Sequence, residues 1–352
     1  VAMGDLIAGD SANPERLTAQ QWDAFDETRR QYRKPLYMVP GRRDVWDAAS
    51  AALYVERYGQ LYYSWDHKGS HFTVLSAEVP GEEGLIGPAQ REWLNRDLVL
   101  AAGAQHRFVF VNAPIWKGTR DGANAWMRDV QPLLQECRVD AVFAAQNNWY
   151  EPDDIGGITY IITGGGGANI GDRPSLGDFY HFLSVTVPAR GPAEISVMTK
   201  DKALPVHVVR PRIRSLVDAL RWDQPIVAGT NMPQVLCMTI SNVMLEHVSL
   251  AMTWEEGAAG TVQPMHGIIT VAPGEVGQMQ FAIPECRRQL RAHWTLSAGS
   301  NVLAQGATMA PQMRLGRYTG PGAPRVALLA GLHEQVVQGE ADWQGADDCS
   351  AT

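Results

Sequence analysis

The sequence predicts a two-part protein, in which a layered α/β domain with a mixed sheet precedes an all-β domain built as a sandwich. Strand-like and helix-like segments alternate through roughly the first 200 of the 352 residues, as in α/β layers. A basic, proline-containing stretch interrupts this alternation after residue 201. From residue 225 to about 315 only short alternating segments appear, separated by Gly, Pro and Asn turns, which is typical of antiparallel β domains.

The first half of the α/β part is expected to contain two helices and a strand pair. Val1 to Asp5 has the pattern of a strand that is already in progress and that enters a Gly-Asp turn. Thr18 is a plausible helix N-cap, because aromatic residues recur after it at helical spacing. We then expect a strand at 36–39, a helix over 45–57 and a hairpin of strands 61–65 and 72–75.

The second half continues the alternation to residue 199. A helix begins at Pro88 and carries Trp93, Leu94 and Leu98 on one face. The remaining expected elements are a helix over 123–136 and strands at 107–111, 140–144, 158–163, 180–187 and 193–199. The domain defined in this way covers residues 1–206.

The C-terminal part divides into a connector, a sandwich and a tail. Residues 207–224 form the basic connector, and residues 225–316 have the strand spacing of an immunoglobulin-like sandwich. Its expected strands lie at 234–240, 248–254, 267–271, 278–283 and 290–297. Residues 317–352 are expected to be an extended linker or the start of a further module.

Composition excludes some classes of function and leaves others open. The formal net charge is -8, whereas a general nucleic-acid binder is more often basic, so we expect no nucleic-acid partner. No run of about 18 apolar residues occurs, so no transmembrane segment is expected. Four cysteines form no CxxC pair. Cys237 and Cys286 fall in the same β-rich region, where one disulfide and two buried free thiols are equally compatible with the sequence.

Other chemistry-bearing residues favour structural interpretations. The histidines are scattered without HxH or HExxH spacing, which favours surface or hydrogen-bonded core positions over metal ligation. Glu151, Asp153 and Asp154 cluster where we expect a turn, so a solvated loop is favoured over a calcium or sugar site. Trp149 lies at a strand end, where it could stack on a sugar or simply pack in the core.

Four turns at expected strand ends carry short polar motifs. They are Gly4-Asp5, Pro40-Gly41-Arg42-Arg43-Asp44, Asn112-Ala113-Pro114 and Ala145-Gln146-Asn147-Asn148. In order and spacing these turns resemble the GD, GNH[DE], H-x-P and GHxH motifs of the calcineurin-like metallophosphoesterases. The resemblance covers roughly residues 1–200 and implies that family's layered α/β fold. The family's first motif, DxH, would lie upstream of Val1.

The departures from this family concern its metal ligands. The family holds two metal ions, roughly 3.5–4 Å apart, which activate a bridging hydroxide against phosphorus. Asp5 matches the bridging Asp. The other matched positions hold different residues: Arg42 and Arg43 for Asn and His of GNH[DE], Asn112 for the His before Pro, and Gln146 and Asn148 for the two His of GHxH. Because guanidinium repels cations and amides are weak ligands, we expect a vestigial site with no catalytic residue, no metal and no cofactor.

The two arginines have two alternative explanations. A guanidinium could replace the positive charge of the lost metals, and we expect Arg43, or less readily Arg42, to point into the site and pair with Asp5. Alternatively, Arg42 and Arg43 could bind an anion, since guanidinium matches phosphate or sulfate bidentately.

The sequence therefore favours a pseudoenzyme with a binding, scaffold or accessory role, whose partner is a protein or a larger assembly. A phosphoester hydrolase with an atypical metal site is one alternative. A carbohydrate-binding protein is another, because the chain has 11 Trp and its tail, GEADWQGADDCSAT, is similar to the opening of carbohydrate-binding sandwich modules. Immunoglobulin-like modules often accompany secreted bacterial enzymes, so we expect a periplasmic or secreted location.

Overall fold

The computed structural model describes two compact units, Val1–Pro211 and Arg212–Thr352. The residues it describes are 1–9, 14–118, 120–167, 169–188, 190–226, 234–255, 262–283, 290–310, 313–318, 325–330 and 343–345. The boundary between the units falls inside the stretch 207–224 that we expected to be a connector.

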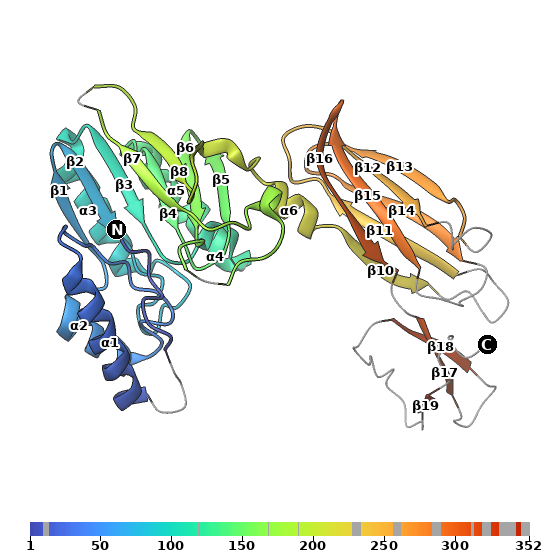
Figure 1. The fold of residues 1–352 in the computed structure, drawn as a ribbon, viewed down its shortest axis with the longest axis horizontal. Helices are drawn as coiled ribbons and strands as arrows, with labels where there is room; N and C mark the ends of the chain where they lie inside the picture. The colour runs from blue at the N-terminus through green and yellow to red at the C-terminus, as the bar shows by residue number, and fades with distance from the viewer. Residues whose placement is uncertain are drawn as a thin grey trace. The chain divides into compact units, whose positions relative to one another are not determined.

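A six-stranded mixed sheet forms the centre of the first unit (Figure 1). Its order is β1-β2-β3-β4-β6-β5, where the central pairs β2–β3, β3–β4 and β4–β6 are parallel and both edge strands are antiparallel. The strands are β1 (Tyr63–His67), β2 (Ser70–Val74), β3 (His106–Phe110), β4 (Ala141–Ala144), β5 (Tyr150–Ile155) and β6 (Ile158–Thr163). Because the central strands are parallel, their carboxyl ends meet at one edge of the sheet.

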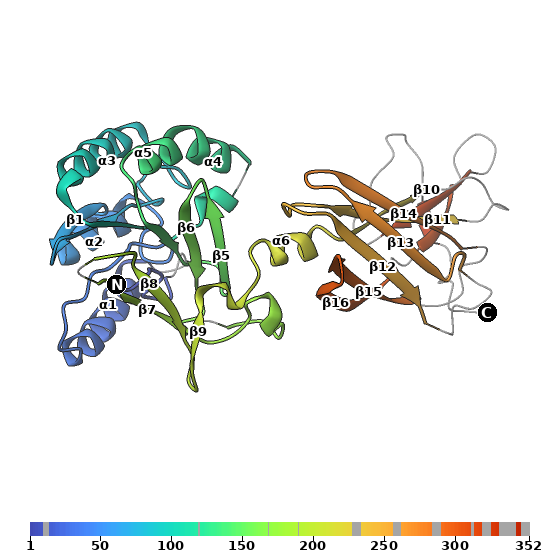
Figure 2. The same cartoon turned by 90° about the horizontal axis from the view of Figure 1, so that it is seen from above.

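Three helices cover one face of this sheet: α3 (Pro88–Leu100), α4 (Arg120–Ala125) and α5 (Gln131–Glu136) (Figure 2). Helix α3 starts at a proline, which suits the first turn because its missing N–H would have no intrahelical acceptor there. A π-helical turn at Trp126–Val130 joins α4 to α5. Pro132 explains the irregularity, since it has no N–H to donate to the carbonyl of Arg128 one turn earlier.

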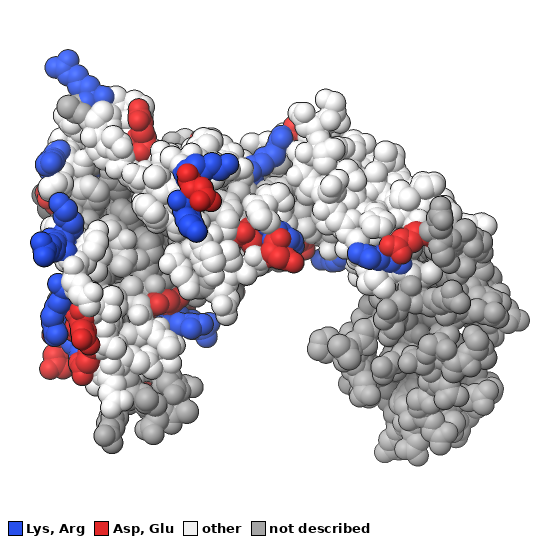
Figure 3. Space-filling model, viewed as in Figure 1, with Lys and Arg blue, Asp and Glu red and all other residues white. Residues whose placement is uncertain are grey.

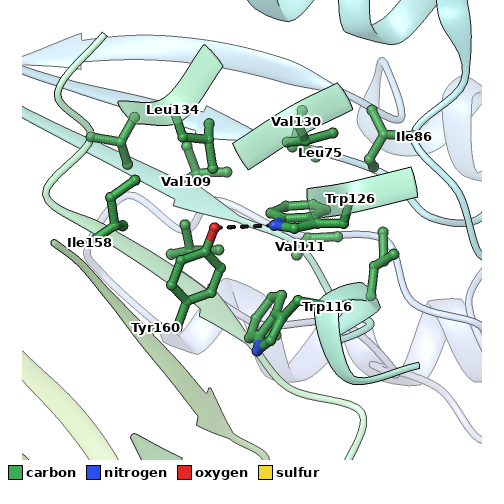
Figure 4. Packing of buried hydrophobic residues seen from close by; sticks show 14 of the residues in the cluster. Leu75, Ile86, Val109, Val111, Trp116, Trp126, Val130, Leu134, Ile158 and Tyr160 are labelled. Carbon is green, nitrogen blue, oxygen red and sulfur yellow. Dashed lines mark hydrogen bonds between the residues drawn. The ribbon is translucent and has the colours of Figure 1, made fainter. Parts of the chain in front are cut away.

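The core between these helices and the sheet is rich in tryptophan (Figure 4). The Trp116 and Tyr160 rings meet edge to face with centroids 4.7 Å apart. The indole N–H of Trp126 donates to the Tyr160 hydroxyl over 3.1 Å. These aromatic side chains bury a large apolar area while the polar atoms of Trp126 and Tyr160 remain bonded, which favours one defined packing.

The opposite face of the sheet is covered by a three-stranded antiparallel sheet (Figure 2). It contains β7 (Phe182–Thr186), β8 (Glu194–Met198) and β9 (Ala203–Pro205), in that order. Helices α1 (Pro14–Gln31) and α2 (Ala48–Tyr58) pack together around Trp22, whose ring contacts Tyr54 and Tyr58. The first unit is thus layered, as the sequence predicted.

The second unit contains antiparallel sheets. One sheet has the order β10-β11-β14, from β10 (Arg221–Ile226), β11 (Gln234–Ser241) and β14 (Val276–Ile283). Another has the order β13-β12-β15-β16, from β12 (Val248–Trp254), β13 (His266–Val271), β15 (Arg291–Ala298) and β16 (Asn301–Met309). Trp222 and Phe281 of the first sheet contact Trp254 of the second, so these two sheets pack face to face. Strands β17 (Met313–Tyr318), β18 (Arg325–Ala330) and β19 (Trp343–Gly345) pair in a further sheet.

The coarse prediction is therefore confirmed: a mixed-sheet α/β part precedes a β-rich part. Several local predictions were wrong. Thr18 does not cap a helix, because α1 already begins at Pro14. The expected strand at 36–39 is reduced to one parallel bridge between Ala2 and Met38. The predicted connector contains a short helix, α6 (Ile213–Asp218).

The surface view shows basic and acidic side chains in small separate groups among the described residues of that face (Figure 3). In the described part of the chain, every helix is too short or too polar to cross a membrane.

Candidate functional site

The candidate site is the junction of the N-terminal segment with the turn at residues 40–44. The Asp44 carboxylate is fully buried and holds this junction together. It accepts backbone N–H groups of Gly41 (2.8 Å), Asp5 (2.8 Å), Leu6 (2.7 Å) and Ile7 (3.3 Å). Burial raises the pKa of Asp44 to about 7, although the N–H donors oppose this shift.

Two glycines allow the segments of this junction to approach closely. A Cβ atom on Gly41 would lie 2.6 Å from Asp5 Oδ1 and 2.9 Å from Asn112 Cγ. A Cβ on Gly4, whose φ is +90°, would lie 2.6 Å from Asn112 Nδ2. Asp5 and Asn112 therefore lie against the same glycine, where only a residue without a Cβ fits.

Asn112 follows β3 and is completely buried. Its side-chain Nδ2 donates to the carbonyl of Met3 over 2.7 Å. Its Oδ1 is also buried and has no hydrogen-bond partner within the described structure. A buried amide oxygen without a hydrogen-bond donor lowers the stability of the fold, so a donor or a cation that reached Asn112 Oδ1 would be favourable.

The predicted ion pair between an arginine and Asp5 is wrong. Arg42 and Arg43 are both exposed, and the ion pairs of the described residues include none between either guanidinium and Asp5. Instead, the backbone N–H of Arg43 donates to Asp5 Oδ1 over 2.9 Å. The physical reason is that a backbone dipole can bond the carboxylate at short range, while the guanidinium keeps its hydration in water.

Glu78 is a member of the site that the sequence analysis missed. It lies in the segment after β2, the residue is 7% exposed, and it is near enough to Arg42 and Asp5 for both charges to act on its pKa. Burial raises the pKa of Glu78 to about 7; Arg42 opposes this rise and Asp5 adds to it. The available signal was its position, because Glu78 follows a parallel strand at the same sheet edge as Asn112.

Gln146 and Asn148 lie in the loop that follows β4, beside the end of β3. Gln146 has a left-handed backbone with φ of 53° and is partly exposed. Asn148 is exposed, and its side-chain amide donates to the carbonyl of Asn169 over 3.1 Å. The amide nitrogens of Asn112 and Asn148 are thus both committed to backbone acceptors within the fold.

The acidic cluster that we expected in a loop lies on a strand. Glu151 and Asp153 belong to β5 and are buried. Glu151 pairs with Lys117, and its other oxygen accepts the indole N–H of Trp149 over 3.2 Å. The polar edge of Trp149 is therefore used within the fold, which favours the packing interpretation of this residue.

The remaining candidates have structural roles or lie outside the description. His71, His106 and His181 are buried and hydrogen-bonded, as the sequence predicted for core histidines. Within the described ranges, no group of three or more His, Cys, Asp or Glu side chains is arranged to hold a metal ion. Cys237 is a buried free cysteine on β11, while its possible partner Cys286 lies outside the described residues.

Comparison with known proteins gives few matches. No family model and no curated protein matches the chain. One similar solved structure is GAP50, the anchor in the inner membrane complex of Plasmodium, at 17% identity and a TM-score of 0.37, covering 48% of this chain and 63% of that one. Another is DesR, a β-glucosidase from Streptomyces venezuelae in complex with D-glucose, at 9% identity and a TM-score of 0.18, covering 64% and 36%. The chain spans less than two thirds of either structure, and neither similarity supports a function.

Proposed function

We propose that this chain is a catalytically inactive member of the metallophosphoesterase fold, joined to an immunoglobulin-like sandwich, and that it serves as a binding, scaffold or accessory subunit. The observation that carries the proposal is the position of Arg43, whose backbone N–H donates to Asp5 Oδ1. This contact fixes an arginine beside the only acidic residue that matches a family ligand. Guanidinium is protonated at every physiological pH, so this position cannot supply a metal ligand.

The other replaced ligands support the same conclusion. The Asn112 and Asn148 side-chain amides donate to backbone carbonyls, and Gln146 offers a neutral amide in place of imidazole. Two-metal hydrolysis needs strong ligands that hold both cations and lower the pKa of a bridging water. A scaffold that keeps its strand-end turns without those ligands can still present a surface to a partner.

The test is a hydrolase assay on the purified chain after incubation with Mn²⁺, Zn²⁺, Fe²⁺ or Mg²⁺. We expect p-nitrophenyl phosphate and bis(p-nitrophenyl) phosphate to be hydrolysed no faster by the wild type than by Asp5→Asn, and metal analysis to find no two bound ions per chain. Turnover that disappears in Asp5→Asn would refute the proposal, because this control removes the one retained family ligand without changing side-chain size.

One observation favours the hydrolase alternative. Glu78 brings a second carboxylate near Asp5, and Asn112 Oδ1 is a buried acceptor beside the same residue. These are oxygen donors, which suit a hard cation. If the assay shows Asp5-dependent turnover, Glu78→Gln should reduce it as well, whereas a contaminating phosphatase would be unaffected by either substitution.

A further inference from the structure

His71 lies between two carboxylates on different elements of the first unit. It belongs to β2, and its side chain is 6% exposed. Its Nδ1 lies 2.8 Å from Asp66 Oδ1 on β1, and its Nε2 lies 2.9 Å from Asp97 Oδ2 on α3. A neutral imidazole has only one N–H, so only the doubly protonated ring can donate to both carboxylates.

The second carboxylate is itself held in place. Asp97 accepts the hydroxyls of Ser64 over 2.5 Å and Thr73 over 3.0 Å, in addition to His71. Burial alone would raise the pKa of Asp97, but these donors lower it overall. Burial alone would lower the pKa of His71, but the bonds to Asp97 and Asp66 raise it above its ordinary 6.5. The two partners therefore favour the same charged state.

Strand β3 places a cationic side chain, Arg107, next to His71, but its guanidinium bonds to other groups. Opposite His71 on β3 is Arg107. Its guanidinium donates to the carbonyls of Ala101 over 3.1 Å and Ala102 over 2.6 Å, beyond the end of α3. The charged groups around the ring are thus Asp66 from β1, Asp97 from α3 and Arg107 from β3, and both carboxylates bond the ring directly.

Strand β1 connects this cluster to the segment of residues 37–38, which enters the candidate site. The hydroxyl of Tyr63 on β1 accepts the backbone N–H of Met38 and donates to its carbonyl, each over 3.0 Å. The ring of Trp65 on β1 stacks on Tyr37 with centroids 3.7 Å apart. Residues 37 and 38 lead directly into the turn 40–44, so the position of β1 sets the start of that turn.

We propose that His71 is a pH-sensitive clamp that fixes the edge strand β1 to α3 and, through β1, orders the turn at residues 40–44. When the ring loses a proton, its Nδ1 lone pair faces the Asp66 carboxylate and repels it. Asp66 is the freer partner, since its side chain is 78% exposed, whereas that of Asp97 is 12% exposed. Asp66 therefore moves into water and β1 becomes less firmly held. The turn at residues 40–44 then becomes less ordered, because β1 no longer fixes residues 37 and 38. This inference does not depend on what the turn binds.

The test combines a titration with hydrogen exchange on the full chain. Histidine-selective NMR gives the pKa of His71, and a spectrum of His71→Asn assigns its signal. Backbone exchange of residues 63–67 and 38–44 is then measured across that titration and corrected for intrinsic rates. We expect His71 to titrate above 6.5, and local opening to increase about tenfold for each unit by which its pKa exceeds 6.5.

Two variants separate the clamp from a general effect of pH. Asp66→Asn keeps the size of an exposed side chain and should abolish most of the pH-dependent opening. His106→Gln is the matched control, because His106 is equally buried but contacts a single carboxylate, Asp140, at 3.2 Å; this variant should keep the wild-type profile. A His71 pKa at or below 6.5, or unchanged exchange at 63–67 across the titration, would overturn the clamp. A change at 63–67 without one at 38–44 would overturn its connection to the turn.

Discussion

Replacing Glu78 by Gln should stabilise the first unit at neutral and alkaline pH. Burial raises the pKa of this carboxyl from 4.5 to about 7, and among the described residues no hydrogen bond or ion pair involves its side-chain oxygens. Between these values the folded protein holds a proton that the unfolded chain has released, so stability falls as pH rises from about 4.5 to about 7. Glutamine has nearly the same size and no charge, so it removes this penalty.

The magnitude follows from the shift. The shift is about 2.5 pKa units, so at about 1.4 kcal/mol per unit the full penalty is about 3.5 kcal/mol, and partial hydration reduces it to roughly 1–3 kcal/mol. For a unit of about 200 residues this corresponds to an increase in Tm of several degrees at pH 8. Below pH 4.5 the two proteins should be equally stable, because the carboxyl is then protonated in both states of the wild type.

Thermal and urea unfolding of both proteins, followed by circular dichroism from pH 4 to pH 8.5, measures this difference. Glu83→Gln is the control, because Glu83 lies five residues away, is exposed, and accepts the backbone N–H of Gly81. Its substitution should not stabilise the protein in this pH range. If Glu78→Gln is less stable than the wild type at pH 8, the carboxylate has a favourable partner and the reasoning fails. A stability difference that does not change with pH would refute it equally.

Three further outcomes test the site and the core. Gly41→Ala should lower the free energy of unfolding in urea by about 1–3 kcal/mol, because the added Cβ would collide with the backbone and carboxylate of Asp5. Gly103→Ala is the control: its Cβ would meet open space, so its free energy of unfolding should stay within about 0.5 kcal/mol of the wild type. Arg43→Ala should change the unfolding free energy by less than about 0.5 kcal/mol, since the exposed guanidinium forms no ion pair with Asp5; a loss of several kcal/mol would restore the rejected pairing. Leu94→Ala should lower the free energy of unfolding by about 2–5 kcal/mol because this side chain of α3 is fully buried in the core, and thermal unfolding that leaves Tm unchanged would contradict the assigned core.

The local pattern of the sequence determined the layered architecture. Apolar alternation located β1, β2, β3, β4 and β6 of the central sheet to within about two residues, and Pro88 located the start of α3. The edge strand β5 was missed, because its acidic residues are typical of a turn. The resemblance of the turns to the family motifs placed Asp5, Asn112 and the turn at residues 40–44 in one site, and in the structure Asp5 and Asn112 both lie against Gly41. The sequence could not show the π-helical turn before Pro132, since the same apolar spacing fits a continuous helix.

Only the tertiary structure decided the charge state and contacts of the site. The residue types alone predicted an ion pair between Arg43 and Asp5. In the structure the backbone N–H of Arg43, and not its guanidinium, donates to that carboxylate. Glu78 belongs to the site because the fold buries it near Arg42 and Asp5, and these surroundings raise its pKa. The order of residues shows neither its burial nor its neighbours. Hydrophobic periodicity is a local property that can be seen in the sequence. The desolvation and the pairing of charged side chains depend on which distant segments meet after folding.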